Sequence, residues 1–180
     1  MDEQRPIFLI GFMACGKTTL GRALEAATGI AFTDTDAEVE REAGMPVSEI
    51  FAVNGEGEFR RMETEALRRV CAAGGCRVVA CGGGTPCREE NMDLMLRCGT
   101  VVWLDADTDI TVRRLLDAPG QRPLAEGLDA AGLRELVERG KAARKRYYSR
   151  AHRRFDSSRL DTPAQIEESV KRFITEIIDE

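Results

Sequence analysis

Short apolar runs alternate along the chain with longer segments whose apolar residues recur at helical spacing. Near-continuous runs of apolar and β-branched residues are typical of strands that are buried on both faces of a parallel sheet. The predicted strands cover residues 6–11, 30–34, 77–81, 100–105 and 153–158, of which the last is the most polar.

Helical periodicity predicts helices over residues 18–28, 56–73, about 107–117 and from 163 onward. In the first of these, Leu20, Leu24 and Ala27 share one face. The last opens with Thr162 as N-cap and Pro163 at the first helical position, where proline costs a helix nothing.

Strands that alternate with helices indicate a parallel sheet with helices on both faces. The length of 180 residues fits one domain with one core. We therefore predict a three-layer α/β/α fold with a central five-stranded parallel sheet, in a single domain over residues 1–180. Ligands of such sheets bind at the carboxyl ends of the strands.

A phosphate-binding loop follows the first predicted strand. Residues 11–18 read GFMACGKT and match GxxxxGK(S/T), the P-loop motif, between a strand and a helix. The glycines let successive N–H groups converge on phosphate oxygens, Lys17 places a cation on the β- and γ-phosphates, and the Thr18 hydroxyl takes a Mg²⁺ position. The residues expected to contact ATP here are Gly11, Ala14, Cys15, Gly16, Lys17, Thr18 and Thr19.

A P-loop alone does not separate kinases from GTPases or motor ATPases. Guanine is read by NKxD, and neither Asn54 nor Asn91 is followed by lysine. Two carboxylates, Asp34 and Asp36, end the second predicted strand, and positions two apart in extended chain point to the same side. One would orient Mg²⁺ through water and the other would accept a proton from a hydroxyl acceptor. The alternative is a solvated loop or a cap for the next helix.

Charge and cysteine usage narrow the partners. The net charge is −5, which argues against a nucleic-acid binder. Residues 139–154 include eight Lys or Arg, which we interpret mostly as a solvated helix face, with one or two pointing inward. No apolar run is long enough to span a membrane, and the N-terminus lacks the basic start of a signal peptide. With six cysteines and no CxxC pair, we expect free thiols and a cytoplasmic protein.

Five segments in order make the chain resemble the shikimate kinase family, from Ile7 to about Phe155. They are GFMACGKTTLG, FTDTD, IFAVNGEGEFRRME, VVACGGG and QRPL. The third is the most specific, because generic nucleotide kinases do not carry it alongside the DxD and GGG segments. The resemblance implies a P-loop NTPase fold of the nucleoside-monophosphate-kinase kind. It also implies ATP and Mg²⁺ as cofactors, a monomer, and transfer of the γ-phosphate to the 3-hydroxyl of shikimate on the route to chorismate and aromatic amino acids.

The resemblance also implies roles for single residues. Asp36 would bind the ring hydroxyls and act on the 3-hydroxyl, and Asp34 would help to hold Mg²⁺ with Thr18. Arg60 would grip the substrate carboxylate, and the N–H of Gly83 would contact the substrate. These substrate-binding residues belong partly to helices over about 36–74.

A mobile lid over about 114–125 is a further implication of the resemblance. Arg122 would close with it over the phosphates as a catalytic cation beside Lys17, and Arg114 would lie against the adenine. Arg144, four residues before Tyr148, would be the second arginine on the carboxylate.

The match departs from the family pattern at this second arginine. Arg146 stands where the family usually has proline, so other registers nominate Arg146 or Arg139 in place of Arg144. Other functions also remain open at this point: another small-molecule P-loop kinase such as a gluconate kinase, a nucleotide-binding regulatory protein without turnover, or a nucleic-acid-binding role for residues 139–154.

Overall fold

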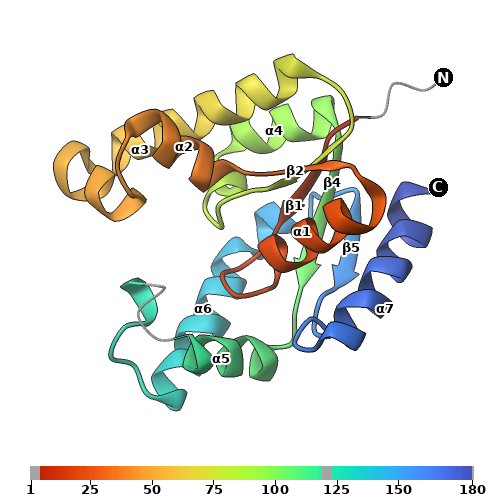
Figure 1. The fold of residues 1–180 in the computed structure, drawn as a ribbon. Helices are drawn as coiled ribbons and strands as arrows, with labels where there is room; N and C mark the ends of the chain where they lie inside the picture. Colours follow the sequence, from red (N-terminus) through yellow and green to blue (C-terminus); the bar gives the residue numbers. More distant parts are fainter. Residues whose placement is uncertain (1–4, 119–122, 180) are drawn as a thin grey trace.

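Five parallel strands form one sheet in the computed structural model, which describes residues 5–118 and 123–179 (Figure 1). Their order across the sheet is β2-β3-β1-β4-β5, and every pair of neighbours is parallel. The strands are β1 (Ile7–Ile10), β2 (Ala31–Asp34), β3 (Arg77–Ala80), β4 (Thr100–Asp105) and β5 (Arg153–Asp156). The five-stranded parallel sheet expected from the apolar runs is thus confirmed.

Helices connect the strands and cover the sheet. They are α1 (Lys17–Thr28), α2 (Thr35–Ala43), α3 (Val47–Ala73), α4 (Glu89–Cys98), α5 (Thr108–Asp117), α6 (Ala130–Tyr148) and α7 (Pro163–Phe173). Short helical turns are η1 (Thr85–Cys87), η2 (Pro123–Ala125) and η3 (Ile174–Ile178). In the described part of the chain, no helix combines the length and the apolar composition that crossing a membrane requires.

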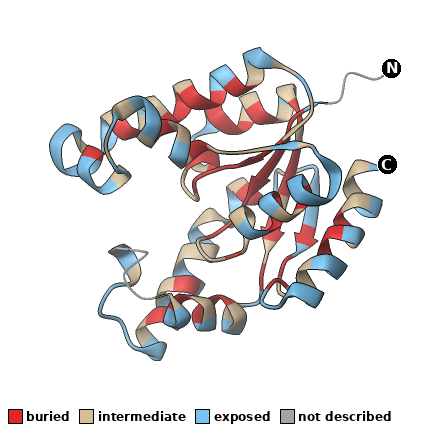
Figure 2. Cartoon of the chain, in the orientation of Figure 1, coloured by how far each residue is buried: buried red, intermediate tan, exposed pale blue. Residues whose placement is uncertain are grey.

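Two apolar cores lie on opposite faces of the sheet, which is why the strands are the reddest part of Figure 2. Along β1, Ile7 and Leu9 pack with α1 and α7, whereas Phe8 and Ile10 pack with α3, α4 and the end of α6. Burying each such side chain stabilises the fold by roughly 1.5–3 kcal/mol. The strand therefore reads as a continuous apolar run because both of its faces are covered.

The α3 helix bends at Gly55, whose φ of 79° and ψ of 168° are not helical. Glycine tolerates this positive φ because it has no Cβ. The helix predicted from residue 56 is the part after the bend, and a further helical segment from Val47 precedes it. Both parts pack on α2 through a small core of buried residues: Val39, Ile50, Phe59 and Ala66.

The predicted start of α7 is confirmed. Thr162 caps α7 by accepting from the N–H of Gln165, and Pro163 is the first helical residue. However, Ala27 is exposed, so the buried face of α1 is narrower than predicted. The pattern also failed to predict the part of α6 before residue 139, and it missed α4, which is ten residues long and buries few apolar side chains, chiefly Met92 and Met95.

Three neighbouring strands bring the predicted chemistry to one edge of the sheet. The phosphate loop follows β1, and Asp34 ends β2. Residues 82–84, three consecutive glycines that we call the glycine triplet, follow β3. Because β2, β3 and β1 are adjacent and parallel, their carboxyl ends meet at that edge.

Candidate active site

Glycine is required at both ends of the phosphate loop. Gly11 has φ 150° and Gly16, which caps α1, has φ 97°. A Cβ on Gly11 would lie 2.4 Å from the carbonyl oxygen of Leu104, and one on Gly16 would lie 2.5 Å from Cδ1 of Leu160. The loop therefore keeps its shape only with glycine at these positions.

Lys17 folds back over the loop from the first turn of α1. Its Nζ donates to the carbonyl oxygens of Gly11 at 2.8 Å and Phe12 at 3.1 Å. The ammonium group thus lies among the backbone amides that a P-loop directs at phosphate, next to the positive end of the α1 dipole.

Asp34 connects the phosphate loop with α2. One oxygen, Oδ1, caps α2 by accepting from the N–H of Asp36 at 3.0 Å. The other, Oδ2, accepts from the hydroxyl of Thr18 at 3.2 Å. The helix cap considered as an alternative for this carboxylate is therefore present, and the same side chain still faces the phosphate loop. A hydroxyl and a carboxylate oxygen are hard ligands of the kind that Mg²⁺ prefers, so this donor set fits that ion.

A cavity of about 200 Å³ adjoins the loop. It brings together the four residues expected to bind substrate: Asp36, Arg60, Gly83 and Arg144. The rest of its lining is Met13, Val47, Phe59, Glu63, Gly82, Gly84 and Leu124. These residues come from six parts of the chain, namely the phosphate loop, α2, α3, the glycine triplet, η2 and α6, which the fold gathers at the carboxyl edge of the sheet.

The buried carboxylate of Glu63 holds Arg60 in place. Nη1 of Arg60 donates to Oε2 of Glu63 at 2.6 Å, and the other oxygen of Glu63 accepts from the Thr85 hydroxyl at 2.5 Å. Glu63 is fully buried, whereas about a quarter of the Arg60 side chain is exposed to the cavity side. Burial acts to lower the pKa of Arg60, but hydrogen bonds and charge from Glu63 and Glu56 raise it overall. The guanidinium is a fixed, permanent cation.

The glycine triplet allows these groups to approach one another. A Cβ on Gly82 would lie 2.6 Å from Oδ1 of Asp36 and 2.7 Å from Oε1 of Glu63. A Cβ on Gly84 would lie 2.8 Å from Nη1 of Arg60. A side chain at Gly82 would displace Asp36 and Glu63, and a side chain at Gly84 would displace Arg60.

Of the three arginines considered for the second carboxylate contact, Arg144 is the one that lines the cavity. Its guanidinium lies over the ring of Phe12, 4.9 Å from the centroid. Arg139 is 80% exposed and pairs with Glu135, while Arg146 stacks on the ring of Tyr147. The geometry thus favours Arg144 over both alternatives.

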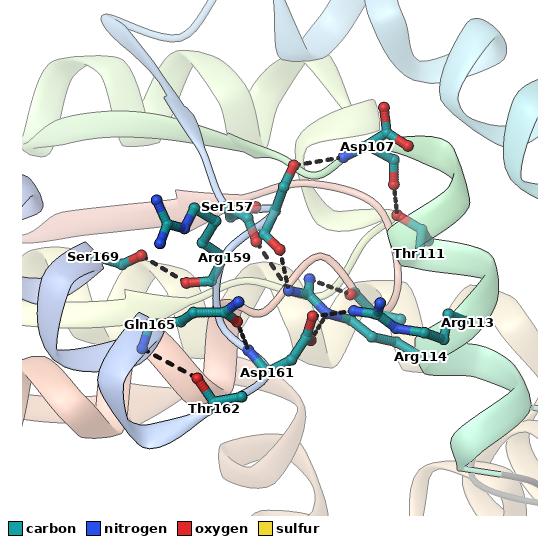
Figure 3. A network of polar contacts seen from close by, with 12 residues as sticks. Asp107, Thr111, Arg113, Arg114, Ser157, Arg159, Asp161, Thr162, Gln165 and Ser169 are labelled. Carbon is teal, nitrogen blue, oxygen red and sulfur yellow. Dashed lines mark hydrogen bonds and ion pairs between the residues drawn. The ribbon is translucent and has the colours of Figure 1, made fainter.

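A second cavity, of about 650 Å³, lies on the other side of the phosphate loop. It is lined by loop residues from Ala14 to Thr19 other than Cys15, by the end of α5, and by the segment before α7. Arg114 belongs to its lining, and Figure 3 shows the polar contacts that hold its side chain. The guanidinium donates to the Asp161 carboxylate at 2.6 Å, to the carbonyl of Ala14 at 3.2 Å, and to the carbonyls of Ser157 and Ser158. Arg114 thereby links the phosphate loop to the loop after β5.

Comparison with known proteins identifies the family. Residues 13–178 match the family model described as shikimate kinase. A shikimate kinase of Bacteroides thetaiotaomicron is 36% identical over 166 residues, covering 92% of this chain and 94% of the relative. One of Symbiobacterium thermophilum is 45% identical over 150 residues, covering 81% and 82%.

Solved structures agree. The crystal structure of the Bacteroides thetaiotaomicron shikimate kinase has a TM-score of 0.91 at 35% identity, covering 98% of this chain and 99% of that one. The Acinetobacter baumannii shikimate kinase, solved in complex with shikimate, has a TM-score of 0.80 at 28% identity, covering 98% and 95%.

The chain belongs to the shikimate kinase family. It is accordingly an ATP-dependent kinase that transfers phosphate to a hydroxyl group, and its fold is of the P-loop NTPase kind. The resemblance inferred from the five sequence segments is confirmed.

The lid predicted over about 114–125 falls partly outside the described residues. Arg122 lies outside the described residues, which resume at position 123. Leu124, just beyond it, lines the 200 Å³ cavity while leaving 65% of its surface exposed.

Three side chains that hold the candidate site together were not predicted from the sequence: Glu63, Asp161 and Tyr148. Glu63 appeared only as the last residue of the segment IFAVNGEGEFRRME, with no role assigned to it. Asp161, which fixes Arg114, carried no recognisable signal because the two lie far apart in sequence. Tyr148 served only to count back to Arg144; their spacing of four on one helix was the signal that both face the same way.

Proposed function

We propose that the chain transfers the γ-phosphate of ATP to the 3-hydroxyl of shikimate, producing shikimate 3-phosphate and ADP. The observation that carries this proposal is the cavity that unites Asp36, Arg60 and Arg144 beside the phosphate loop. A carboxylate and two guanidinium groups suit a small molecule that has hydroxyls at one end and a carboxylate at the other.

Asp36 is proposed as the general base. Its carboxylate lies against Gly82 in the cavity wall, in the first turn of α2. As the substrate hydroxyl oxygen forms its bond to the γ-phosphorus, Asp36 accepts the proton from that hydroxyl. The bond between the γ-phosphorus and the bridging oxygen breaks, and ADP leaves. Lys17 stabilises the charge on the transferring phosphoryl group.

Arg60 and Arg144 are proposed as the carboxylate clamp. They come from different helices, α3 and α6, and reach the same cavity. Glu63 fixes the first guanidinium and the Phe12 ring supports the second. Two pre-positioned arginines orient the acid so that its 3-hydroxyl faces Asp36, which is the positioning that phosphoryl transfer needs.

Thr18 and Asp34 are proposed to hold Mg²⁺, Thr18 directly and Asp34 through water. Mg²⁺ supplies neutralisation of the phosphate charge when it is bound. Arg114 is proposed to lie against adenine in the larger cavity, with Arg122 closing over the phosphates from a lid at about 114–125. We further propose that residues 1–180 act as one catalytic domain and as a monomer, with the helices over about 36–74 binding the substrate.

A coupled assay of ADP release tests the function. Shikimate, quinate, gluconate and nucleoside monophosphates are each added to the enzyme with Mg·ATP. We expect strong stimulation by shikimate alone, because the clamp and Asp36 must be engaged together. A gluconate kinase would respond to gluconate, and a regulatory protein without turnover would respond to none of the four.

A further inference from the structure

Tyr148 joins the last turn of α6 to the middle of the glycine triplet. Its hydroxyl donates to the carbonyl oxygen of Gly83 at 2.8 Å. The ring is 99% buried and packs against Trp103, with centroids 5.9 Å apart. Burial raises the pKa of Tyr148 well above its usual value, so the phenol stays protonated and donates this hydrogen bond across the whole working pH range.

Three further polar groups of the triplet have hydrogen-bond partners. The N–H of Gly82 donates to the Thr35 hydroxyl at 3.2 Å, and its carbonyl accepts from the N–H of Thr85 at 3.0 Å. The Gly84 carbonyl accepts from the N–H of Cys87 at 3.0 Å. Within residues 5–118 and 123–179, nothing accepts a hydrogen bond from the N–H of Gly83 or of Gly84. These two amides remain for a ligand in the cavity.

Consecutive glycines have wide backbone freedom, so the direction of these amides depends on such external contacts. At Gly83 the strong contact is Tyr148, since the Cys87 thiol lies at 3.8 Å and is a weak donor. Fixing the Gly83 carbonyl fixes the peptide plane that carries the Gly84 N–H and limits the rotation of Gly83 itself.

We propose that Tyr148 is a positioning residue for the acid substrate: its hydroxyl sets the glycine triplet in the conformation that presents N–H groups to shikimate. Arg144, one turn earlier on α6, lines the same cavity. The α6 helix therefore positions both Arg144, the second guanidinium of the clamp, and Tyr148, which holds the glycine triplet. This inference rests on the proposed function, because it assigns Tyr148 to the shikimate side of the reaction.

The test is Tyr148→Phe, which keeps the buried ring and removes the hydroxyl. We expect the KM for shikimate to rise about tenfold, the worth of one buried hydrogen bond. The KM for ATP should stay within about twofold, because the nucleotide cavity does not include the triplet. Fluorescence of Trp103, the single tryptophan, gives an independent shikimate affinity, which should weaken by the same factor.

Tyr147→Phe is the matched control. Tyr147 is the adjacent residue on α6, and its hydroxyl meets the exposed Arg146 instead of the cavity. Neither KM should change in that variant. Incorporating 4-aminophenylalanine at position 148 restores a donor on the same ring and should return the shikimate KM to within about twofold of wild type.

The proposal is overturned if Tyr148→Phe leaves the shikimate KM unchanged, or raises the KM values of shikimate and ATP equally. The second result would mean that Tyr148 only supports the fold. The same conclusion would follow if Tyr148→Phe lowered the melting temperature and 4-aminophenylalanine failed to restore the shikimate KM. Shikimate-dependent turnover of the wild-type enzyme is measured in the same series. Its absence would refute the proposed function, whereas normal wild-type turnover with an unaffected variant would refute only the role of Tyr148.

Discussion

The buried carboxylate of Glu63 holds the guanidinium of Arg60 at 2.6 Å, beside Gly84. An ordinary helix ion pair on a surface is worth little. Here one partner is fully buried and also binds Thr85, so the pair fixes the direction of the arginine. Arg60 thus keeps this (i, i+3) ion pair and still lines the cavity, where it is proposed to contact the substrate carboxylate.

Replacing Arg60 should weaken binding of the acid substrate. We expect Arg60→Ala to raise the KM for shikimate at least tenfold, because a charge-assisted contact is worth about 1.5–3 kcal/mol. The KM for ATP should change little. Steady-state kinetics with each substrate varied in turn measures both.

Arg61→Ala is the control for that variant. Arg61 is the next residue on α3, its side chain is 62% exposed, and it forms an ion pair with Glu58. It should behave as wild type. An unchanged shikimate KM in Arg60→Ala would remove Arg60 from the clamp.

A methyl group at Gly84 should have a similar effect from the other side. The added Cβ would lie 2.8–3.1 Å from three guanidinium atoms of Arg60, and the arginine would have to move. We expect Gly84→Ala to raise the shikimate KM several-fold with a smaller effect on the melting temperature. Gly57→Ala, where a Cβ meets nothing within 4 Å, should be neutral or stabilise α3 by up to about 1 kcal/mol. Equal KM values for the two variants would contradict this geometry.

Asp36→Asn should abolish transfer while leaving nucleotide binding intact. The amide keeps the shape of the side chain but cannot accept the hydroxyl proton, a loss of about 10²–10⁴ in kcat. Turnover is measured by ADP release, and nucleotide affinity by calorimetry with a non-hydrolysable ATP analogue. A variant with wild-type kcat would show that the base lies elsewhere.

Removing the Thr18 hydroxyl should impair use of Mg²⁺. We expect Thr18→Val to require at least about tenfold more Mg²⁺ for half-maximal activity, since a metal ligand and the contact with Asp34 are lost together. Thr28→Val, at the other end of α1, tests for a general effect on that helix and should leave the Mg²⁺ requirement unchanged. Chelation with EDTA should stop turnover of the wild-type enzyme, and added Mg²⁺ should restore it. Activity that survives chelation would exclude this assignment.

The strands and the phosphate loop were predictable because local sequence determines them. A strand such as β1 is apolar along its whole length since both faces are covered, and GxxxxGK(S/T) needs its residues next to one another. The α4 helix was missed because its local apolar pattern is weak. Its ten residues bury little more than Met92 and Met95, and that pattern is too short to stand out.

The candidate site was predictable only where a motif identifies a residue and its chemistry. Asp36 and Arg60 stood out through motif spacing, and the sheet then placed them in one cavity. The contact of Tyr148 with Gly83 joins residues 65 apart, and that of Arg114 with Asp161 joins residues 47 apart. Neither pair has a local pattern, because tertiary packing alone creates the contact. The choice of Arg144 over Arg146 and Arg139 likewise depended on which face of α6 turns toward the cavity.

Identifying the product by NMR tests the central claim most directly. The enzyme is incubated with Mg·ATP and shikimate, and the products are followed by ³¹P and ¹H spectra. The account predicts one phosphomonoester, coupled to the proton on C3 of shikimate, formed in equal amount to ADP. Inorganic phosphate as the sole new phosphorus signal, or a phosphate on another hydroxyl, would contradict it.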